Sequence, residues 1–324
     1  MRSPARSRRR LLCAVLSLAV ASAVALATSA VSSGSSAATR KLTLMLDFIP
    51  SPYPQANIDL KIVQPTSAGD YARLVSAGKA DVGMADGVDL LTFISKGTKY
   101  KGFLATLQEP LAGIGVLKSS GITSPKQLTG KKVATPGSPS NKAFLVTMIR
   151  NSGGDPNSVK LVTTGFDFAK YLVAGKIDAF TGYWTDAIEA DVESGTRLRF
   201  LRLDKFGGPR YPSLLFYATT ATIAKDPSLI RDFAAATTHG YNDMLKNPTG
   251  ALNAFLSLNK AVKRAPTKAA LTQILPLFKA GTTQYGHVNL GDLAKLSAFL
   301  AKNGLIKKAV PASEAATNAY VPKS

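Results

Sequence analysis

The only tryptophan of the chain, Trp184, stands beside Tyr183 directly after a short apolar run. Aromatic faces in such a position suit a flat, polarizable ring, which they bind by stacking. Asp186 and Glu189 follow closely, and their carboxylates could accept hydrogen bonds from an amino group on the edge of that ring. The same aromatic pair could also pack in a core, and the residues alone leave both interpretations open.

A second candidate segment precedes a helix that we expect at about 141–150. It contains Gly137, Ser138, Pro139 and Ser140. Serine and proline pre-form the first helical turn and leave backbone N–H groups that can hold an anion or a polar oxygen. An ordinary helix cap has the same local sequence.

A third candidate segment is a proline-rich loop after the first apolar run, with Asp47, Phe48 and Tyr53 as candidate contacts. Proline cannot continue a central strand, so we expect this loop at the end or edge of a sheet, where a site can form. A plain connecting loop would have the same composition.

Cysteine and histidine chemistry is nearly excluded by the composition. The chain has one cysteine, Cys13, and two histidines, His239 and His287, neither of which has a second ligand at metal-binding spacing. We therefore expect no disulfide, no catalytic residue, no metal and no cofactor. The corresponding prediction is that the protein is not an enzyme.

An arginine-rich start precedes an uncharged apolar run over residues 11–27. This pattern is typical of a secretory signal peptide, because small residues follow it instead of a basic stop-transfer segment. We predict that residues 1–38 are a cleaved signal peptide and that the mature chain is exported. Residues 7–12 also fit the twin-arginine route.

The formal charge of +20 falls to about +15 once the five arginines of the leader are removed. Lysine and arginine are scattered singly through the rest of the chain, without a dense basic run or interleaved aromatics. This distribution indicates a cationic secreted surface and not a nucleic-acid-binding one.

The candidate residues follow short apolar runs that alternate with amphipathic segments, the pattern of α/β lobes with largely parallel sheets. The expected strands are 41–46, 58–63, 80–84, 113–117, 132–135, 159–162, 177–181 and 214–218. From residue 226 onward we expect helices. Their expected separators are Pro248, Pro266, Pro276 and Gly281, and one apolar face carries Leu229, Phe233, Ala236 and Tyr241.

Residues 72–82 align without gaps on residues 169–179, ninety-seven positions later. Each copy predicts a helix end, a glycine in the left-handed cap conformation and an aspartate entering a strand. Coincidence in an alanine-rich chain is the alternative to a true repeat. A true repeat means two similar lobes, and ligands of such sheets bind beyond the carboxyl ends of the strands. Asp86 and Tyr183-Trp184 would then face one another.

Together these segments resemble the thiamine-pyrimidine-precursor binding family of ABC-importer receptors, whose fold is shared by fungal thiamine-pyrimidine synthases. The resemblance covers nearly all of the mature chain. It rests on residues 44–50, 75–83, 121–128, 130–133, 135–140, 182–184, 200–209 with Tyr211, 247–248, 303–308 and 317–320.

The fold that this resemblance implies is a two-lobed periplasmic-binding-protein fold, the type II Venus flytrap, with two interlobe crossovers near 113–118 and 213–222. Lobe I would comprise residues 39–116 and 219–324, and lobe II residues 117–218. The first lobe is shortened, because only residues 55–57 separate the proline-rich loop from the next strand, where the family normally carries a helix.

The function that it implies is an extracytoplasmic receptor that captures a thiamine-precursor pyrimidine and delivers it to an ABC permease. The loop 137–140 would be a polar clamp, Tyr183 and Trp184 a stacking wall, and Asp47 and Tyr211 flanking contacts. We expect a monomer whose small heteroaromatic ligand favours the closed lobes.

Three alternatives stay open. The ligand could be another small molecule, such as a flavin, a sulfonate or nitrate, although an anion would need several basic ligands. The chain could also be an envelope protein that has lost its ligand, which the shortened lobe favours. A synthase is disfavoured, because the fungal enzymes depend on a cysteine-rich motif that this chain lacks.

Overall fold

The structure is a computed structural model of the chain that describes residues 40–45, 58–63, 70–164, 168–185, 195, 197–260, 262–282 and 284–323. The predicted signal peptide lies outside this part. So do five of the predicted contact residues, Asp47, Phe48, Tyr53, Asp186 and Glu189.

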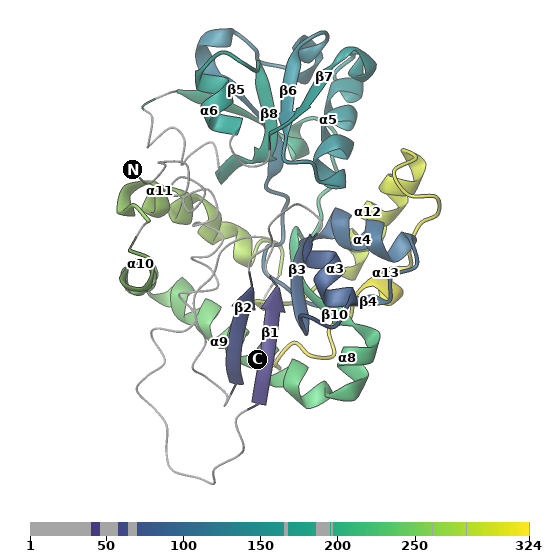
Figure 1. Cartoon of the computed structure of the whole chain (residues 1–324), viewed down its shortest axis with the longest axis vertical. Helices are drawn as coiled ribbons and strands as arrows, with labels where there is room; N and C mark the ends of the chain where they lie inside the picture. Colours follow the sequence, from purple (N-terminus) through teal and green to yellow (C-terminus); the bar gives the residue numbers. More distant parts are fainter. Residues whose placement is uncertain are drawn as a thin grey trace.

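Two five-stranded sheets form the two lobes of an α/β fold, as predicted (Figure 1). The first sheet has the order β2-β1-β3-β10-β4, and the second has the order β7-β6-β8-β5-β9. Their strands are β1 (Arg40–Met45), β2 (Ile58–Val63), β3 (Val82–Asp86), β4 (Tyr100–Ala105), β10 (Leu214–Thr219), β5 (Ala112–Leu117), β6 (Lys132–Thr135), β7 (Lys160–Thr163), β8 (Ala179–Tyr183) and β9 (Leu198–Arg202).

The sheets are mixed, whereas the sequence pattern predicted largely parallel ones. In each sheet the strand that follows a crossing runs antiparallel to its neighbours: β5 pairs with β8 and β9, and β10 pairs with β3 and β4. The register gives the reason. Ala112 at the start of β5 lies opposite Tyr183 at the end of β8, and Leu214 lies opposite Asp86. A strand that begins opposite the carboxyl end of the neighbouring strand must run antiparallel to that neighbour.

The chain passes between the sheets at residues 106–111 and again at residues 203–213. We call these segments the first and second crossing. The predicted crossovers and lobe boundaries lie later and cut through β5 and β10. An apolar run predicts a strand, but it does not show which sheet the strand will join.

The internal repeat is structural. Gly78 and Gly175 both have the left-handed conformation, with φ of +65° and +67°. The carboxylate of Asp81 accepts the backbone N–H of Thr43 in β1 at 2.6 Å. The carboxylate of Asp178 accepts the backbone N–H of Lys132 in β6 at 2.8 Å. Asp81 therefore connects the start of β3 to β1, and Asp178 connects the start of β8 to β6. These strands have equivalent places in the two sheets, so the two lobes contain the same structural unit.

Helices cover both faces of each sheet. They are α3 (Asp70–Ser76), α4 (Gly87–Ser95), α5 (Pro139–Asn151), α6 (Phe168–Val173), α8 (Thr220–Lys225), α9 (Pro227–Lys246), α10 (Pro248–Leu258), α11 (Arg264–Ile274), α12 (Leu290–Lys302) and α13 (Ala312–Ala315). The predicted helical last third is confirmed, with Pro248 at the start of α10. Pro266 lies in the first turn of α11 and does not separate helices, because that turn needs no N–H at this position.

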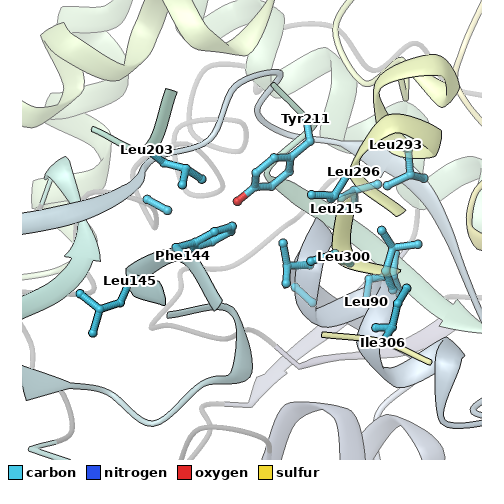
Figure 2. Close-up of a cluster of buried hydrophobic side chains, with 14 of the residues drawn as sticks. Leu90, Phe144, Leu145, Leu203, Tyr211, Leu215, Leu293, Leu296, Leu300 and Ile306 are labelled. Atoms are coloured by element: carbon cyan, nitrogen blue, oxygen red, sulfur yellow. The ribbon is translucent and has the colours of Figure 1, made fainter. Parts of the chain in front are cut away.

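Buried side chains continue from one lobe into the other. Leu90 of α4 and Leu296 of α12 belong to the same apolar cluster as Phe144 and Leu145 of α5 (Figure 2). The ring of Phe144 stacks on that of Tyr211 from the second crossing, with 6.0 Å between ring centroids. The structure therefore shows the lobes packed together. None of the described helices is long and apolar enough to span a membrane.

Candidate functional site

Asp86 lies at the junction of β3 and α4, and its side chain is 2% exposed. As the N-cap of α4 it accepts the backbone N–H of Val88 at 2.8 Å. Its second oxygen accepts the hydroxyls of Tyr211 at 3.2 Å and of Ser213 at 3.0 Å. Asp86 therefore joins the first lobe to the second crossing. That it faces Tyr183-Trp184 across a ligand stays a prediction.

Burial, with a smaller contribution from the neighbouring Asp89 carboxylate, raises the pKa of Asp86 from 3.8 to about 8. The three hydrogen bonds to the carboxylate act in the opposite direction and do not compensate for the lost solvation. Burial and Asp86 also raise the pKa of Tyr211 well above 10, so its hydroxyl stays a neutral donor. Near pH 7 the buried Asp86 carboxyl therefore keeps its proton.

Asp89, in the first turn of α4, reaches across to the second lobe. Its carboxylate accepts the backbone N–H of Ser140 at 3.3 Å and the Ser140 hydroxyl at 3.2 Å. Both residues are 5% exposed. This contact joins the two lobes directly at the start of α5.

Helix α5 begins at Pro139, close to the expected start, but its N-cap residue Ser138 does not form the expected capping hydrogen bond. Gly137 has φ of +95°, Ser138 is the N-cap residue, and Pro139 is the first residue of the helix. The Ser138 side chain makes no capping hydrogen bond. Instead, its hydroxyl pairs with that of Ser140 at 2.9 Å and accepts the side-chain amide of Asn141. The first-turn N–H of Ser140 is thus satisfied from the other lobe.

Trp184 is 8% exposed and belongs to a core cluster with Leu107 and Leu111 of the first crossing. Its backbone N–H donates to the carbonyl of Leu111 at 3.0 Å. The guanidinium of Arg202 lies 5.9 Å from the centre of its ring. In this conformation the protein itself packs against Trp184, so its stacking on a ligand stays a prediction.

Two buried polar atoms near Trp184 have no hydrogen-bond partner among the described residues. They are the indole Nε1 of Trp184 and the hydroxyl of Thr185. Leaving a buried polar group unpaired costs about 1–3 kcal/mol, so such atoms are suited to receive a partner from a ligand. The neighbouring Tyr183 is partly buried and packs against the same core cluster as Trp184. It also contributes, after burial and Asp86, to the raised pKa of Tyr211.

The repeat also relates the two sides of the site. With the shift of ninety-seven residues, Tyr183 corresponds to Asp86 and Trp184 to Gly87. The structure therefore brings Asp86, Tyr211, Ser140 and the aromatic pair to the region between the lobes.

Sequence reasoning missed Asp89 and Ser213. An acidic residue in a first helical turn is ordinary, because it interacts favourably with the helix dipole, so Asp89 gave no distinctive signal.

Gly87 lets the second crossing approach the start of α4. A Cβ at this position would lie 2.8 Å from the carbonyl oxygen of Pro212 and 3.3 Å from the Tyr211 ring. We expect Gly87→Ala to destabilise the protein by about 1–3 kcal/mol, although alanine is the better helix former. Urea unfolding measures this. The matched change Gly291→Ala, in the first turn of α12, should be neutral or stabilising, and equal effects of the two would contradict the prediction.

Among the described residues, no three His, Cys, Asp or Glu side chains are grouped so that they could hold a metal ion. The chemistry available between the lobes is hydrogen bonding by carboxylates, hydroxyls and an indole, together with aromatic surface. This set suits the binding of a small polar ring.

A family profile described as NMT1/THI5-like matches residues 53–251. The chain belongs to the NMT1/THI5-like family. The matched range includes Asp86, Asp89, the start of α5, Trp184 and Tyr211, so it contains both sides of the site. It also agrees with the family resemblance recognised in the sequence.

Two relatives in this family carry different names. The formylaminopyrimidine-binding protein of Halalkalibacterium halodurans is 27% identical over 206 residues, which are 63% of this chain and 62% of that protein. The 4-amino-5-hydroxymethyl-2-methylpyrimidine phosphate synthase of Legionella pneumophila is 24% identical over 299 residues, 87% of this chain and 92% of that protein. Family membership alone therefore does not separate a binding protein from a synthase.

Solved structures with the same fold include alkanesulfonate-binding proteins. The alkanesulfonate-binding protein SsuA of Xanthomonas axonopodis pv. citri, bound to MOPS, has a TM-score of 0.68 at 12% identity and covers 87% of this chain and 99% of its own. The periplasmic aliphatic sulphonate-binding protein SsuA of Escherichia coli has a TM-score of 0.64 at 15% identity, with coverages of 85% and 96%. At these identities the likeness concerns the fold, which is that of periplasmic binding proteins.

Proposed function

We propose that this NMT1/THI5-like protein is the exported receptor of an ABC importer, and that its solute is a thiamine-precursor pyrimidine. The observation that carries the proposal is the buried Asp86. It is held between α4 and the second crossing with Tyr211, beside a second carboxylate that contacts α5. The likeness to a formylaminopyrimidine-binding protein supports the same ligand class.

An aminopyrimidine matches these groups in shape and in hydrogen bonding. Its exocyclic amino group donates hydrogen bonds, which carboxylates such as Asp86 accept. Its ring nitrogens accept hydrogen bonds, which the Trp184 Nε1 and the Thr185 hydroxyl, both without a partner in the described part of the chain, can donate. Its flat face suits stacking on Tyr183 or Trp184. Asp47, Phe48, Tyr53, Asp186 and Glu189 remain proposed contacts from the sequence.

Entry of the ligand requires the lobes to separate, because Asp89 and Ser140 are in contact and the cluster around Phe144 and Tyr211 spans both lobes. A ligand that binds both sides would then stabilise closure by its differential affinity for the closed state. In the proposed function a permease in the membrane recognises that closed form.

Two other functions make different demands on the site. A sulfonate receptor needs positive partners for its ligand, yet the described side chains between the lobes include two carboxylates. The arginines nearest the crossings are already paired, Arg202 with Asp204 at 2.9 Å and Arg210 with Glu109 at 3.5 Å. A synthase would need the reactive cysteines of the fungal enzymes, and the only cysteine here is Cys13.

Thermal-shift titration of the mature chain tests the ligand. Hydroxymethyl-aminopyrimidine and formylaminomethyl-pyrimidine are compared with riboflavin, taurine and nitrate. A pyrimidine present at 100 times its dissociation constant should add about 2.7 kcal/mol of stability. Mass spectrometry should recover it chemically unchanged. Absence of a shift with either pyrimidine overturns the ligand assignment, and a chemically altered pyrimidine overturns the receptor assignment in favour of an enzyme.

A further inference from the structure

Asp89 occupies the position at which a helix N-terminus ordinarily holds an anion. Helix α5 has thirteen residues, and its first turn contains no acidic residue of its own. Its N-cap serine makes no capping bond. The N–H of Ser140 and the Ser140 hydroxyl instead donate to the two carboxylate oxygens of Asp89. A carboxylate bound by two donors at a helix start resembles a bound anion.

The carboxylate comes from the opposite lobe. Asp89 is the third residue of α4, while Ser140 is the second residue of α5. The contact therefore exists only while the lobes are closed. A solute with its own sulfonate, phosphate or carboxylate would compete with Asp89 for the same donors whenever the lobes close on it.

A displaced Asp89 would remain in an unfavourable environment. Asp86 lies close enough for the two carboxylates to interact, and Asp86 is itself 2% exposed. An anionic solute would bring a further negative charge into this buried region, where charges are weakly screened. A neutral or cationic solute with N–H donors would instead be attracted by the Asp89 carboxylate, with the Asp86 carboxyl as a further hydrogen-bonding group.

We infer that Asp89 is a specificity-determining residue that excludes anionic solutes from the closed protein and restricts it to neutral or cationic ones. The inference rests on the proposed receptor function. It concerns the charge of the solute, whereas the proposed ligand concerns the ring. A protein with the same fold is bound to MOPS. That sulfonate is therefore a suitable anionic probe.

The test compares Asp89→Asn and Asp89→Ala with the native protein. Asparagine keeps an oxygen for the N–H of Ser140 but removes the charge, whereas alanine empties the position. Asp292→Asn is the matched control, because Asp292 is likewise the third residue of a helix, α12, and lies in its first turn. MOPS, methanesulfonate and hydroxymethyl-aminopyrimidine are titrated calorimetrically into all four proteins.

We expect MOPS or methanesulfonate to bind Asp89→Ala at least about tenfold more tightly than the native protein or Asp292→Asn, a difference of about 1.4 kcal/mol. Asp89→Asn should show a gain in the same direction. Equal sulfonate affinity in the native and Asp89 variants, or no sulfonate binding to any of them, overturns the inference. Failure of the native protein to bind the pyrimidine would count against the proposed ligand alone, since the sulfonate comparison does not depend on it.

Discussion

Replacing Asp86 by asparagine should make the protein more stable at pH 8 and flatten the dependence of its stability on pH. The folded pKa of Asp86 is about 8 and the ordinary value is 3.8, so the carboxyl contributes stability below about pH 4 that is lost as the pH rises to about 8. Over that interval the Asp86 carboxyl is deprotonated in the unfolded chain and protonated in the folded chain. The free energy of unfolding therefore falls by about 1.4 kcal/mol for each pH unit.

Asparagine suits the position because it keeps every hydrogen bond of Asp86. Its side-chain oxygen can cap α4 by accepting the N–H of Val88, as asparagine commonly does. Its amide can donate to the hydroxyls of Tyr211 and Ser213, which are able to accept. The substitution therefore removes the ionisation and preserves the packing.

Urea unfolding of the native protein, Asp86→Asn and Asp292→Asn at pH 5 and pH 8 measures the effect. The native protein and the Asp292 variant should lose more stability between these two pH values than Asp86→Asn does. Parallel changes in all three proteins would show that Asp86 is ionised in the folded state and would refute the assignment.

Truncation of Trp184 to alanine should cost about 3–5 kcal/mol of folding stability, the range for a buried tryptophan or phenylalanine. The side chain is 8% exposed and packs with Leu107 and Leu111 of the first crossing. Loss of ligand binding by this variant would therefore not separate a contact from a packing role. Trp184→Phe is the more informative change, because it keeps an aromatic ring and removes the Nε1, which has no partner among the residues that the structure describes.

Trp184→Phe should retain the fold and lose affinity for hydroxymethyl-aminopyrimidine by about tenfold, the value of a hydrogen bond worth about 1.4 kcal/mol. Unfolding in urea verifies the first expectation, and calorimetric titration of the pyrimidine measures the second. If folded Trp184→Phe binds the pyrimidine as tightly as the native protein, the indole N–H does not contact the ligand. If Trp184→Ala loses less than about 3 kcal/mol of stability, the burial of Trp184 is contradicted.

The sequence predicted eight of the ten described strands, because each is a short apolar run bounded by turn residues. β4 and β9 were missed. β4 is interrupted by Gly102, and β9 alternates apolar residues with Arg199 and Arg202, so neither resembles a buried strand. Both occupy a sheet edge, as do β2 and β7, which the sequence did predict, so the residue pattern and not the edge position explains the difference.

The repeat and the family resemblance were also visible in the sequence. Left-handed glycines and strand-entry aspartates are local features, and Gly78, Gly175, Asp81 and Asp178 have equivalent positions in the two lobes. The family was identified from motifs spread over nearly the whole mature chain, and the NMT1/THI5-like profile confirms it. The sequence by itself thus determined most of the strands, their duplication and the family.

Tertiary structure alone decided which residues meet. Strand direction in β5 and β10 follows from where each crossing enters its sheet, which a strand's own residues do not encode. Asp89 and Ser140 lie fifty-one positions apart, and their hydrogen bond forms only when α4 and α5 are brought together from opposite lobes. The raised pKa of Asp86 likewise depends on its burial in the folded protein and on the neighbouring Asp89 carboxylate. Local periodicity determines the elements, whereas burial and charge pairing depend on contacts between distant parts of the chain.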